Sequence, residues 1–200
     1  MSDAGHRLTM IRRLSVITSP GELASPEELG AGQRVGRLLG AGGITLVFDG
    51  RAVGAAGAVA EAAAGAGGRL VGVVIESGLP IRADLVERRS ARSVEEQRAM
   101  IAMLADGYLA LPGGFDSIEA ALATFEWRAG GGGEQPLGLL DEGEYYSRLV
   151  GLAPDAVLDR FIAETQRGRL VVGKNLADLL RRLAEYRPPE TRRDHPFDDD

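Results

Sequence analysis

Three glycine-containing loops hold most of the residues that can bind a charged ligand. They are Thr18-Ser19-Pro20-Gly21, the nine residues 49–57, and the six residues 112–117. A glycine between a strand and a helix lets backbone N–H groups approach an anion at the helix N-terminus. One such loop is equally well explained as a plain turn, whereas three favour a nucleotide or phosphate pocket. The ligand contacts predicted in these loops are Ser19, Gly21, Asp49, Gly50, Arg51, Gly54, Pro112, Gly113, Gly114, Asp116 and Ser117.

Other catalytic chemistries find little support in the sequence. Both histidines, His6 and His195, lie in the terminal segments, so Ser19 and Ser117 are poor candidates for a histidine-assisted nucleophile. The chain has no cysteine, which excludes thiolate catalysis and Cys-based zinc sites. The acidic run 198–200 is a solvated tail rather than a set of metal ligands. We therefore expect neither a metal nor a cofactor.

Short β-branched runs alternate with longer Ala- and Leu-rich stretches, and this order positions the loops. Strands are expected at residues 14–18, 44–48, 70–75, 107–111 and 136–140, with a further edge strand at 170–172. Helices are expected at residues 26–39, 55–64, 94–104, 118–127, 144–150, 155–165 and 176–186. The polar stretch 76–92 has weak periodicity and is assigned no element. The alternation predicts an α/β fold whose parallel sheet is covered by helices on both faces, with ligands at the carboxyl ends of the strands.

Length and charge narrow the class of protein. Two hundred residues predict one domain, which we place at residues 14–188 between an N-terminal extension (1–13) and a disordered acidic tail (189–200). The 23 Lys and Arg residues against 29 Asp and Glu give a net charge of −6, which argues against a nucleic-acid partner. No stretch approaches the roughly 20 apolar residues of a membrane span, and no targeting signal is evident. We expect a cytoplasmic protein without membrane contact.

The third loop also carries a family resemblance. The ten residues from Ala105 to Gly114, ADGYLALPGG, resemble the central signature of the LONELY GUY (LOG) family, often labelled lysine-decarboxylase-like. The resemblance runs from about residue 14 to 188, and Tyr145-Tyr146 occurs in the expected order. Known members are cytokinin riboside 5′-monophosphate phosphoribohydrolases. The resemblance implies a Rossmann-like, doubly wound sheet and a homodimer with active sites near the subunit interface.

Several positions depart from the family's motifs. The family pattern is Pro-Gly-Gly, any residue, Gly-Thr, two residues and Glu; here Asp116 and Ser117 replace Gly-Thr, and Ala120 replaces the glutamate. Upstream, Gln97 stands where the family has the arginine thought to act with that glutamate, and Asp49-Gly50-Arg51 replaces a triple glycine. Ala120 can neither stabilise positive charge on a ribose nor activate water. Asp116 disfavours a phosphate, since two unit charges ~4 Å apart repel by about 4 kcal/mol at an effective dielectric constant of 20.

Neighbouring charged residues are candidates to replace the missing pair. Glu119 precedes Ala120 and is turned from it by about 100° on a helix. Arg98 aligns with a family lysine, and Glu96 precedes it on the same helix. We take Glu119, Glu96 and Arg98 as candidate catalytic groups, and Gln97 and Arg98 as candidate ligand contacts. Solvated surface charge is the commoner role for such residues.

Three hypotheses remain open. The leading one is a divergent LOG-family homodimer that still binds a small nucleotide-like molecule while the phosphoribohydrolase reaction is lost or replaced. The second is an active N-glycosidase that releases a base from a nucleoside 5′-monophosphate through relocated groups. The third is a non-catalytic interaction partner of an active paralogue.

Overall fold

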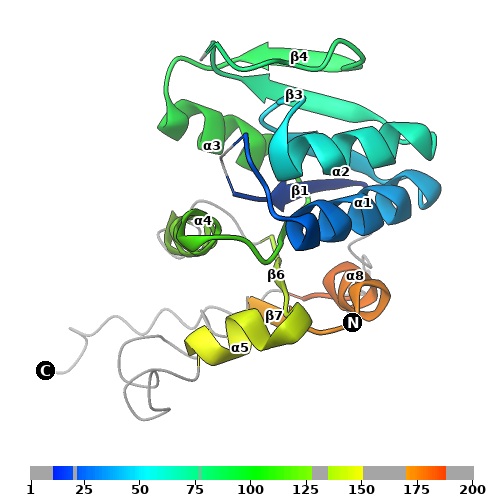
Figure 1. The fold of residues 1–200 in the computed structure, drawn as a ribbon, viewed down its shortest axis with the longest axis vertical. Helices are drawn as coiled ribbons and strands as arrows, with labels where there is room; N and C mark the ends of the chain where they lie inside the picture. Colours follow the sequence, from blue (N-terminus) through cyan, green and yellow to red (C-terminus); the bar gives the residue numbers. More distant parts are fainter. Residues whose placement is uncertain (1–10, 20–21, 77, 128–134, 151–169, 188–200) are drawn as a thin grey trace, which may run out of the picture.

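Seven parallel strands form one sheet in the order β4-β3-β2-β1-β5-β6-β7 (Figure 1). The computed structural model describes residues 11–19, 22–76, 78–127, 135–150 and 170–187. The strands are β1 (Arg13–Ile17), β2 (Thr45–Phe48), β3 (Leu70–Val74), β4 (Glu87–Ser90), β5 (Gly107–Ala110), β6 (Leu137–Leu140) and β7 (Leu170–Gly173). The helices are α1 (Pro26–Ala41), α2 (Gly54–Gly65), α3 (Val94–Leu104), α4 (Phe115–Trp127), α5 (Tyr145–Val150) and α8 (Leu176–Ala184), with a 3₁₀ turn η2 (Glu142–Glu144).

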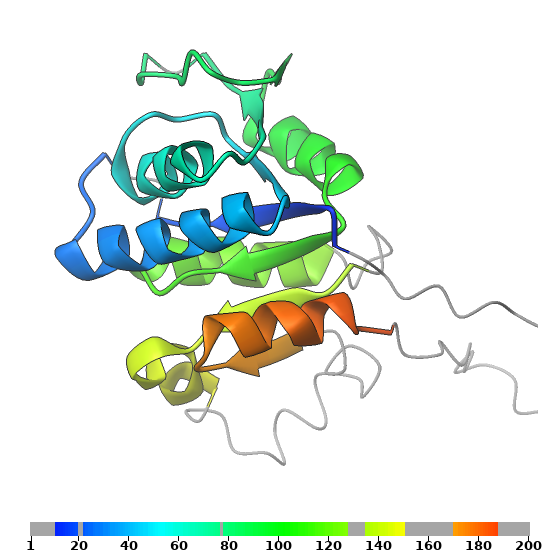
Figure 2. The same ribbon diagram turned by 90° about the vertical axis from the view of Figure 1, so that its right-hand side faces the viewer.

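Helices cover the sheet on both faces, as expected for a doubly wound α/β fold. In Figure 2, α1, α2 and α8 lie on the near face and α4 lies behind the sheet. A large buried cluster joins β1, β2 and β5 to the near-face helices through side chains such as Val35, Val59 and Leu179. A second cluster joins β5 and β6 to α3 and α4 through side chains such as Tyr108 and Ala121. Each helix therefore buries one apolar face against the sheet.

The strand order creates a switch point between β1 and β5. The chain runs outward from β1 to β4, returns through α3, and places β5 on the other side of β1. The loops that follow β1, β2 and β5 therefore end at one edge of the sheet. Ligands of open parallel sheets bind at this kind of edge, which is where the three glycine-containing loops lie.

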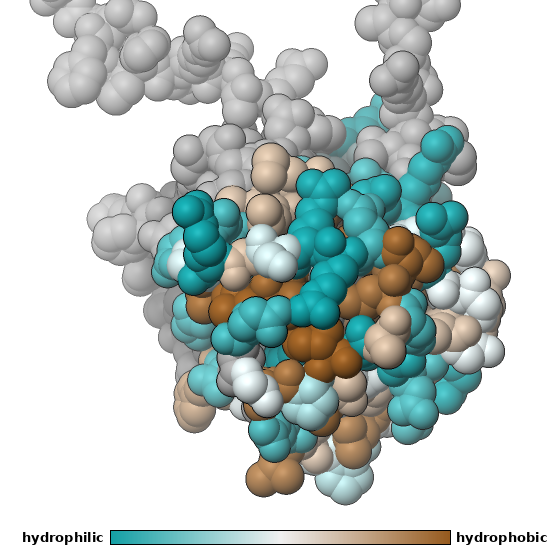
Figure 3. Space-filling view, turned by 90° about the horizontal axis from the view of Figure 1, so that it is seen from above, coloured by the Kyte–Doolittle hydropathy of each residue, from teal (hydrophilic) through white to brown (hydrophobic). Residues whose placement is uncertain are grey.

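The strand β4 is missing from the sequence prediction. It falls in the polar stretch 76–92, and its residues Glu-Arg-Arg-Ser show no apolar alternation because they are mostly exposed at the sheet edge. The strand is defined by its backbone pairing with β3 and not by a pattern of apolar residues. Seen from the β4 side, hydrophilic side chains cross the face between hydrophobic patches (Figure 3). Charged side chains on an edge strand discourage pairing with another sheet.

The other predicted elements are present with small shifts at their ends. The edge strand at 170–172 is confirmed as β7, next to β6. The last helix ends at Ala184 rather than at residue 186. The helix predicted at 155–165, Gly21, most of the extension at 1–13 and the tail at 189–200 lie outside the described residues. Within the described residues, no helix is long and apolar enough to cross a membrane.

Candidate functional site

A cavity of about 450 Å³ lies at the switch point, between α3 and α4 on one side and the loop after β2 on the other. Its floor comes from the end of β1 and from Phe48 and Ile75 at the ends of β2 and β3. Ligand pockets commonly fall between roughly 300 and 1,000 Å³, so the cavity has room for a small molecule. The charged residues that line it are Asp49, Arg51, Arg98, Asp116 and Glu119.

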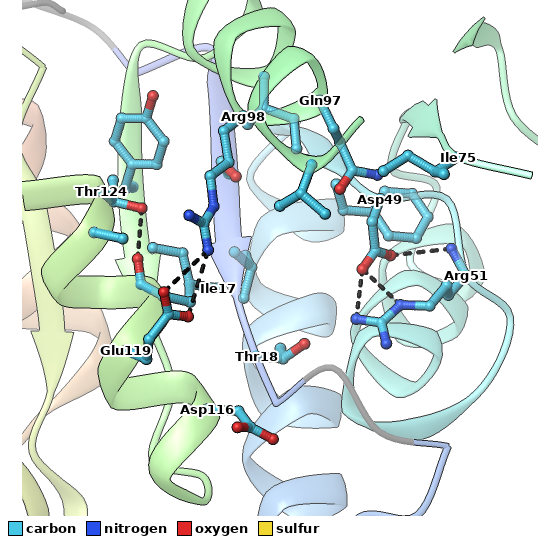
Figure 4. Close-up of a pocket in the computed structure, with 18 of the residues that line it drawn as sticks. Ile17, Thr18, Asp49, Arg51, Ile75, Gln97, Arg98, Asp116, Glu119 and Thr124 are labelled. Carbon is cyan, nitrogen blue, oxygen red and sulfur yellow. Dashed lines mark hydrogen bonds and ion pairs between the residues drawn. The ribbon is translucent and has the colours of Figure 1, made fainter. Parts of the chain in front are cut away.

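Arg98 and Glu119 form an ion pair at this cavity. The Arg98 side chain extends from α3 toward Glu119 on α4, and the N–O distance between them is 3.4 Å (Figure 4). The side chains are 42% and 66% exposed, so the pair lies at the mouth, within reach of a ligand. An acid and a cation therefore converge on the cavity. Arg98 and Glu119 are two of the three residues that the sequence offered as candidate catalytic groups, and both line this cavity.

Gln97 and Ala120, which the motif comparison aligns with an arginine and a glutamate of the family, also line the cavity and carry no charge. The Gln97 amide nitrogen donates a 2.7 Å hydrogen bond to the Val73 carbonyl oxygen, which ties α3 to β3. Arg98 and Glu119 each lie one residue away from these positions, about 100° around their helices. The charged pair is thus displaced along both helices.

A second ion pair lies across the cavity. The Arg51 guanidinium contacts Asp49 with N–O distances of 2.5 and 2.6 Å, and the Arg51 backbone N–H also donates to Asp49 at 3.1 Å. An isolated bridge pairs Arg51 with Ile81, and Ala52 donates to the Pro80 carbonyl at 2.8 Å. These contacts hold the loop against the chain that follows β3. Gly50 adopts a φ of 80°, which explains a glycine between the two charged residues.

Asp116 is the exposed carboxylate in the first turn of α4. It lines the cavity below the two ion pairs in Figure 4, where no dashed line joins it to another residue. The neighbouring Ser117 is buried, and its hydroxyl donates to the Gly114 carbonyl oxygen at 2.8 Å. Ser117 therefore closes the turn that begins α4, and Asp116 is the polar side chain of this turn that lines the cavity.

The loops after β1 and β5 are held together by Glu28. This residue belongs to a capping box at the start of α1, in which Glu28 accepts from the Ser25 backbone N–H at 2.8 Å. The Ser19 hydroxyl also donates to Glu28 at 2.8 Å. Partial burial raises the pKa of Glu28, but hydrogen bonds from Ser25, Ser19 and the Gly114 backbone outweigh it and hold the pKa below its usual value.

Two tyrosines fix the other side of the Pro-Gly-Gly loop. The Tyr145 hydroxyl donates to the carbonyl oxygens of Gly113 and Gly114, and the Tyr146 hydroxyl donates to that of Leu111 at 2.7 Å. Burial raises the pKa of Tyr146 above its usual range, which keeps this hydroxyl protonated as a donor. Asp141 positions the tyrosines, since its buried carboxylate accepts from the backbone N–H of Tyr146 at 2.8 Å.

The structure divides the predicted ligand contacts between two places. A second cavity of about 830 Å³, on the α1 side of the Pro-Gly-Gly loop, is lined by Pro112, Gly113 and Gly114 together with Glu28 and Tyr145. Neither cavity includes Ser19, Gly50, Gly54 or Ser117, and Glu96 points elsewhere, paired with Arg92 at 3.0 Å. The predicted residues that line the cavity at the switch point are Asp49, Arg51, Gln97, Arg98, Asp116 and Glu119.

The sequence interpretation missed the apolar part of this cavity. Apolar side chains carry no chemical signature in a sequence, and only strand order brings them together. Their position at strand ends, next to the predicted loops, was the available signal. They are Val16, Ile17, Phe48, Ile75, Leu79, Ile81, Val94, Ile101 and Ala123.

Among the described residues, no group of three or more His, Cys, Asp or Glu side chains is placed to hold a metal ion. The acidic run at 198–200 lies outside those residues. The charged groups that line the described cavity are carboxylates and guanidinium groups.

Comparison with known proteins gives both the fold and the family. A molybdenum cofactor carrier protein of Chlamydomonas reinhardtii superposes with a TM-score of 0.63 over 86% of this chain and 96% of that one, at 15% identity, which shows a shared fold alone. A probable cytokinin riboside 5′-monophosphate phosphoribohydrolase of Oryza sativa subsp. japonica is 36% identical over 89% of this chain and 74% of its own length.

A bacterial relative gives the same result. A cytokinin riboside 5′-monophosphate phosphoribohydrolase of Rhodococcoides fascians is 33% identical over 71% of this chain and 74% of its own length. The model of a family described as possible lysine decarboxylase matches residues 56–183. With these relatives and this match, the chain belongs to the LOG family, the possible lysine decarboxylase group that contains the cytokinin riboside 5′-monophosphate phosphoribohydrolases.

Proposed function

We propose that this protein binds a nucleoside-type molecule in the cavity between α3 and α4 and hydrolyses the bond between its base and its ribose. The observation that carries the proposal is the Arg98–Glu119 ion pair, which lies on the cavity one residue away from both family positions. Relatives with 33–36% identity are named for hydrolysis at the same kind of linkage.

The pair has the groups that this reaction needs. As the N-glycosidic bond breaks, positive charge develops on the ribose and an electron pair moves to the base. The Glu119 carboxylate stabilises that positive charge and accepts a proton from the water that attacks the ribose carbon. The Arg98 guanidinium donates hydrogen bonds to the base nitrogen that receives the electron pair. The water hydroxyl ends on the ribose, and the proton ends on the free base.

The apolar floor supports the same assignment. Ile17, Ile75 and Phe48 line the cavity and offer apolar contacts for a planar base. The two ion pairs lie on opposite sides of the cavity (Figure 4). Pockets for small ligands are mostly apolar with a few polar groups that fix orientation. A base on the floor brings its ribose toward the mouth, where Arg98 and Glu119 meet.

The test is base release from isopentenyladenosine and from its 5′-monophosphate, followed by chromatography. Glu119→Gln and Arg98→Gln are each expected to lower the rate by at least about 100-fold, the range for one acid–base group. Glu61→Gln on α2 and Arg37→Gln on α1 make the same chemical changes at exposed sites outside the cavity and serve as controls. Release at the parental rate by both cavity variants refutes the assignment.

Binding without hydrolysis is the second candidate, and a specific observation favours it. Gln97 is committed to the Val73 carbonyl, and Ala120 offers a methyl group, so neither family position can take part in the reaction. Ligand-dependent stabilisation of the fold with no base release distinguishes this candidate. At 100 times its dissociation constant a ligand adds about 2.7 kcal/mol of stability. Co-purification of a related chain without any small-molecule binding supports the interaction-partner hypothesis.

We also propose that the protein acts as a homodimer that covers this mouth. Phe115 and Leu122 on α4 are 88% and 57% exposed and share a helix face with Glu119, and Met103 on α3 is 77% exposed. Exposed apolar side chains that share a helix face, as Phe115 and Leu122 do on α4, mark interaction surfaces. A second copy seated here excludes water from the Arg98–Glu119 pair. Light scattering is expected to give twice the chain mass, and Leu122→Glu is expected to give a monomer.

A further inference from the structure

Several hydrogen-bond donors at this sheet edge, which a phosphate could otherwise use, are already used by the chain. The Ser19 hydroxyl donates to Glu28 at 2.8 Å, and the Ser117 hydroxyl and backbone N–H donate to the Gly114 carbonyl at 2.8 and 3.1 Å. The backbone N–H of Gly114 also contributes to the low pKa of Glu28. A carboxylate of the protein itself thus holds the loops after β1 and β5.

The loop after β2 is satisfied in the same way. Asp49 accepts from the Arg51 guanidinium at 2.5 and 2.6 Å and from the Arg51 backbone N–H at 3.1 Å. The Arg51 side chain is 11% exposed, so its charge is compensated and largely covered. A phosphate that used this guanidinium would have to displace a partner held by three contacts.

The cavity as a whole has an excess of negative charge. Three carboxylates, from Asp49, Asp116 and Glu119, face two guanidinium groups, from Arg51 and Arg98, which leaves one net negative charge. Asp116 carries that excess, because the other four residues form the two ion pairs. The second cavity beside the Pro-Gly-Gly loop is also acidic, with Glu27, Glu28 and Glu142 against Arg34. A phosphate monoester carries about −1.5 to −2 at neutral pH and meets negative charge at both cavities.

From this arrangement we infer that the cavity takes an uncharged ribonucleoside rather than a nucleoside 5′-monophosphate. The inference rests on the proposed function and names its substrate class. Ionised carboxylates only accept hydrogen bonds, and a sugar hydroxyl is a donor that suits them. The free 5′-hydroxyl of a nucleoside donates to Asp116 at the N-terminal turn of α4, and the ribose hydroxyls face Glu119. The named activity of the relatives, by contrast, requires a 5′-monophosphate.

The experiment compares two ligands that differ only in the phosphate, isopentenyladenosine and its 5′-monophosphate. Calorimetry gives both dissociation constants and chromatography gives both rates of base release, for the parent chain and for Asp116→Asn. The parent chain is expected to bind the nucleoside at least about tenfold more tightly than the monophosphate. Asp116→Asn is expected to reduce this ratio by lowering the dissociation constant of the monophosphate, because the substitution removes one repelling charge. Asp178→Asn, an exposed change on α8 outside the cavity, is the matched control.

Each outcome decides between the two proposals. The inference is supported if the parent chain binds the nucleoside more tightly than the monophosphate and if the ratio of the two dissociation constants falls in Asp116→Asn but not in Asp178→Asn. This holds whether or not base is released. A parent chain that binds or cleaves the monophosphate at least as well as the nucleoside overturns it while leaving the hydrolase proposal intact. Failure of both ligands to bind a folded chain overturns both. Melting curves of each variant separate loss of binding from loss of folding.

Discussion

The contact between α1 and α2 provides a stability prediction with an internal control. A Cβ atom added at Gly36 would meet the Cβ atom of Ala62 at 2.8 Å and the backbone nitrogen of Ala63 at 2.9 Å, closer than real side chains approach. The contact atoms belong to a packed helix, so Gly36→Ala must separate α1 from α2. Overpacking of this kind costs about 1–3 kcal/mol. The same change at Gly30, on the same helix, meets only the mobile end of Arg34 at 3.4 Å.

The two substitutions should therefore differ in sign. Gly30→Ala removes backbone freedom from the unfolded chain and is expected to stabilise by about 0.5–1 kcal/mol. Urea titration followed by circular dichroism measures both free energies of unfolding, and a chain of this size shifts its melting temperature by about 2–4 °C per kcal/mol. Equal stabilities for Gly36→Ala and Gly30→Ala would refute the close approach of the two helices.

Three further predictions concern the loops and the cavity. Glu28→Gln should weaken the dependence of the free energy of unfolding on pH. The pKa of Glu28 in the folded chain lies below the usual 4.5, so the ionised carboxylate stabilises the fold fully above pH 4.5, and this stabilisation is lost as the pH falls through the folded pKa. Acid titration of the parent and the variant measures the difference. Tyr146→Phe should cost about 1–3 kcal/mol in urea titration, because the Leu111 carbonyl loses a buried donor; a cost near zero contradicts this. Gln97→Arg combined with Ala120→Glu restores the family's pair on the same cavity and should increase base release, whereas an unchanged rate in a folded chain argues against a shared reaction centre.

The positions of strands and helices were predictable where apolar runs were buried on both sides. β3 reads Leu-Val-Gly-Val-Val, and all five residues are buried, so its pattern was clear. β4 was not predictable, because a sheet edge requires backbone pairing on one side only and its exposed side chains need not be apolar. The capping box at Ser25 and Glu28 marked the start of α1 correctly, because that signal is local.

The sequence indicated which loops lie beside the candidate site, but it did not indicate that Arg98 and Glu119 form an ion pair there. The resemblance to the family places Gln97 and Ala120 where its motifs have an arginine and a glutamate, and the sequence leaves open whether Arg98 and Glu119 meet. That depends on where α3 and α4 sit relative to each other, since residues 21 positions apart meet only across the cavity. The role of Glu28 was missed for a related reason. Its capping interaction is visible in the sequence, but its contact with Ser19 depends on how the loop after β1 folds back.

The displaced pair also constrains how a ligand lies in the cavity. Gln97 and Ala120 line it alongside apolar side chains, while Arg98, one position after Gln97, and Glu119, one position before Ala120, reach its exposed mouth. In the proposed pose the base packs on the apolar floor and the sugar lies at the mouth. Asp116, in the first turn of the same helix as Glu119, lines the same cavity and in this pose accepts a hydrogen bond from the 5′-hydroxyl. A phosphate at the 5′ end would instead meet the Asp116 carboxylate, so the proposed reaction and the proposed substrate class both depend on the carboxylates of α4.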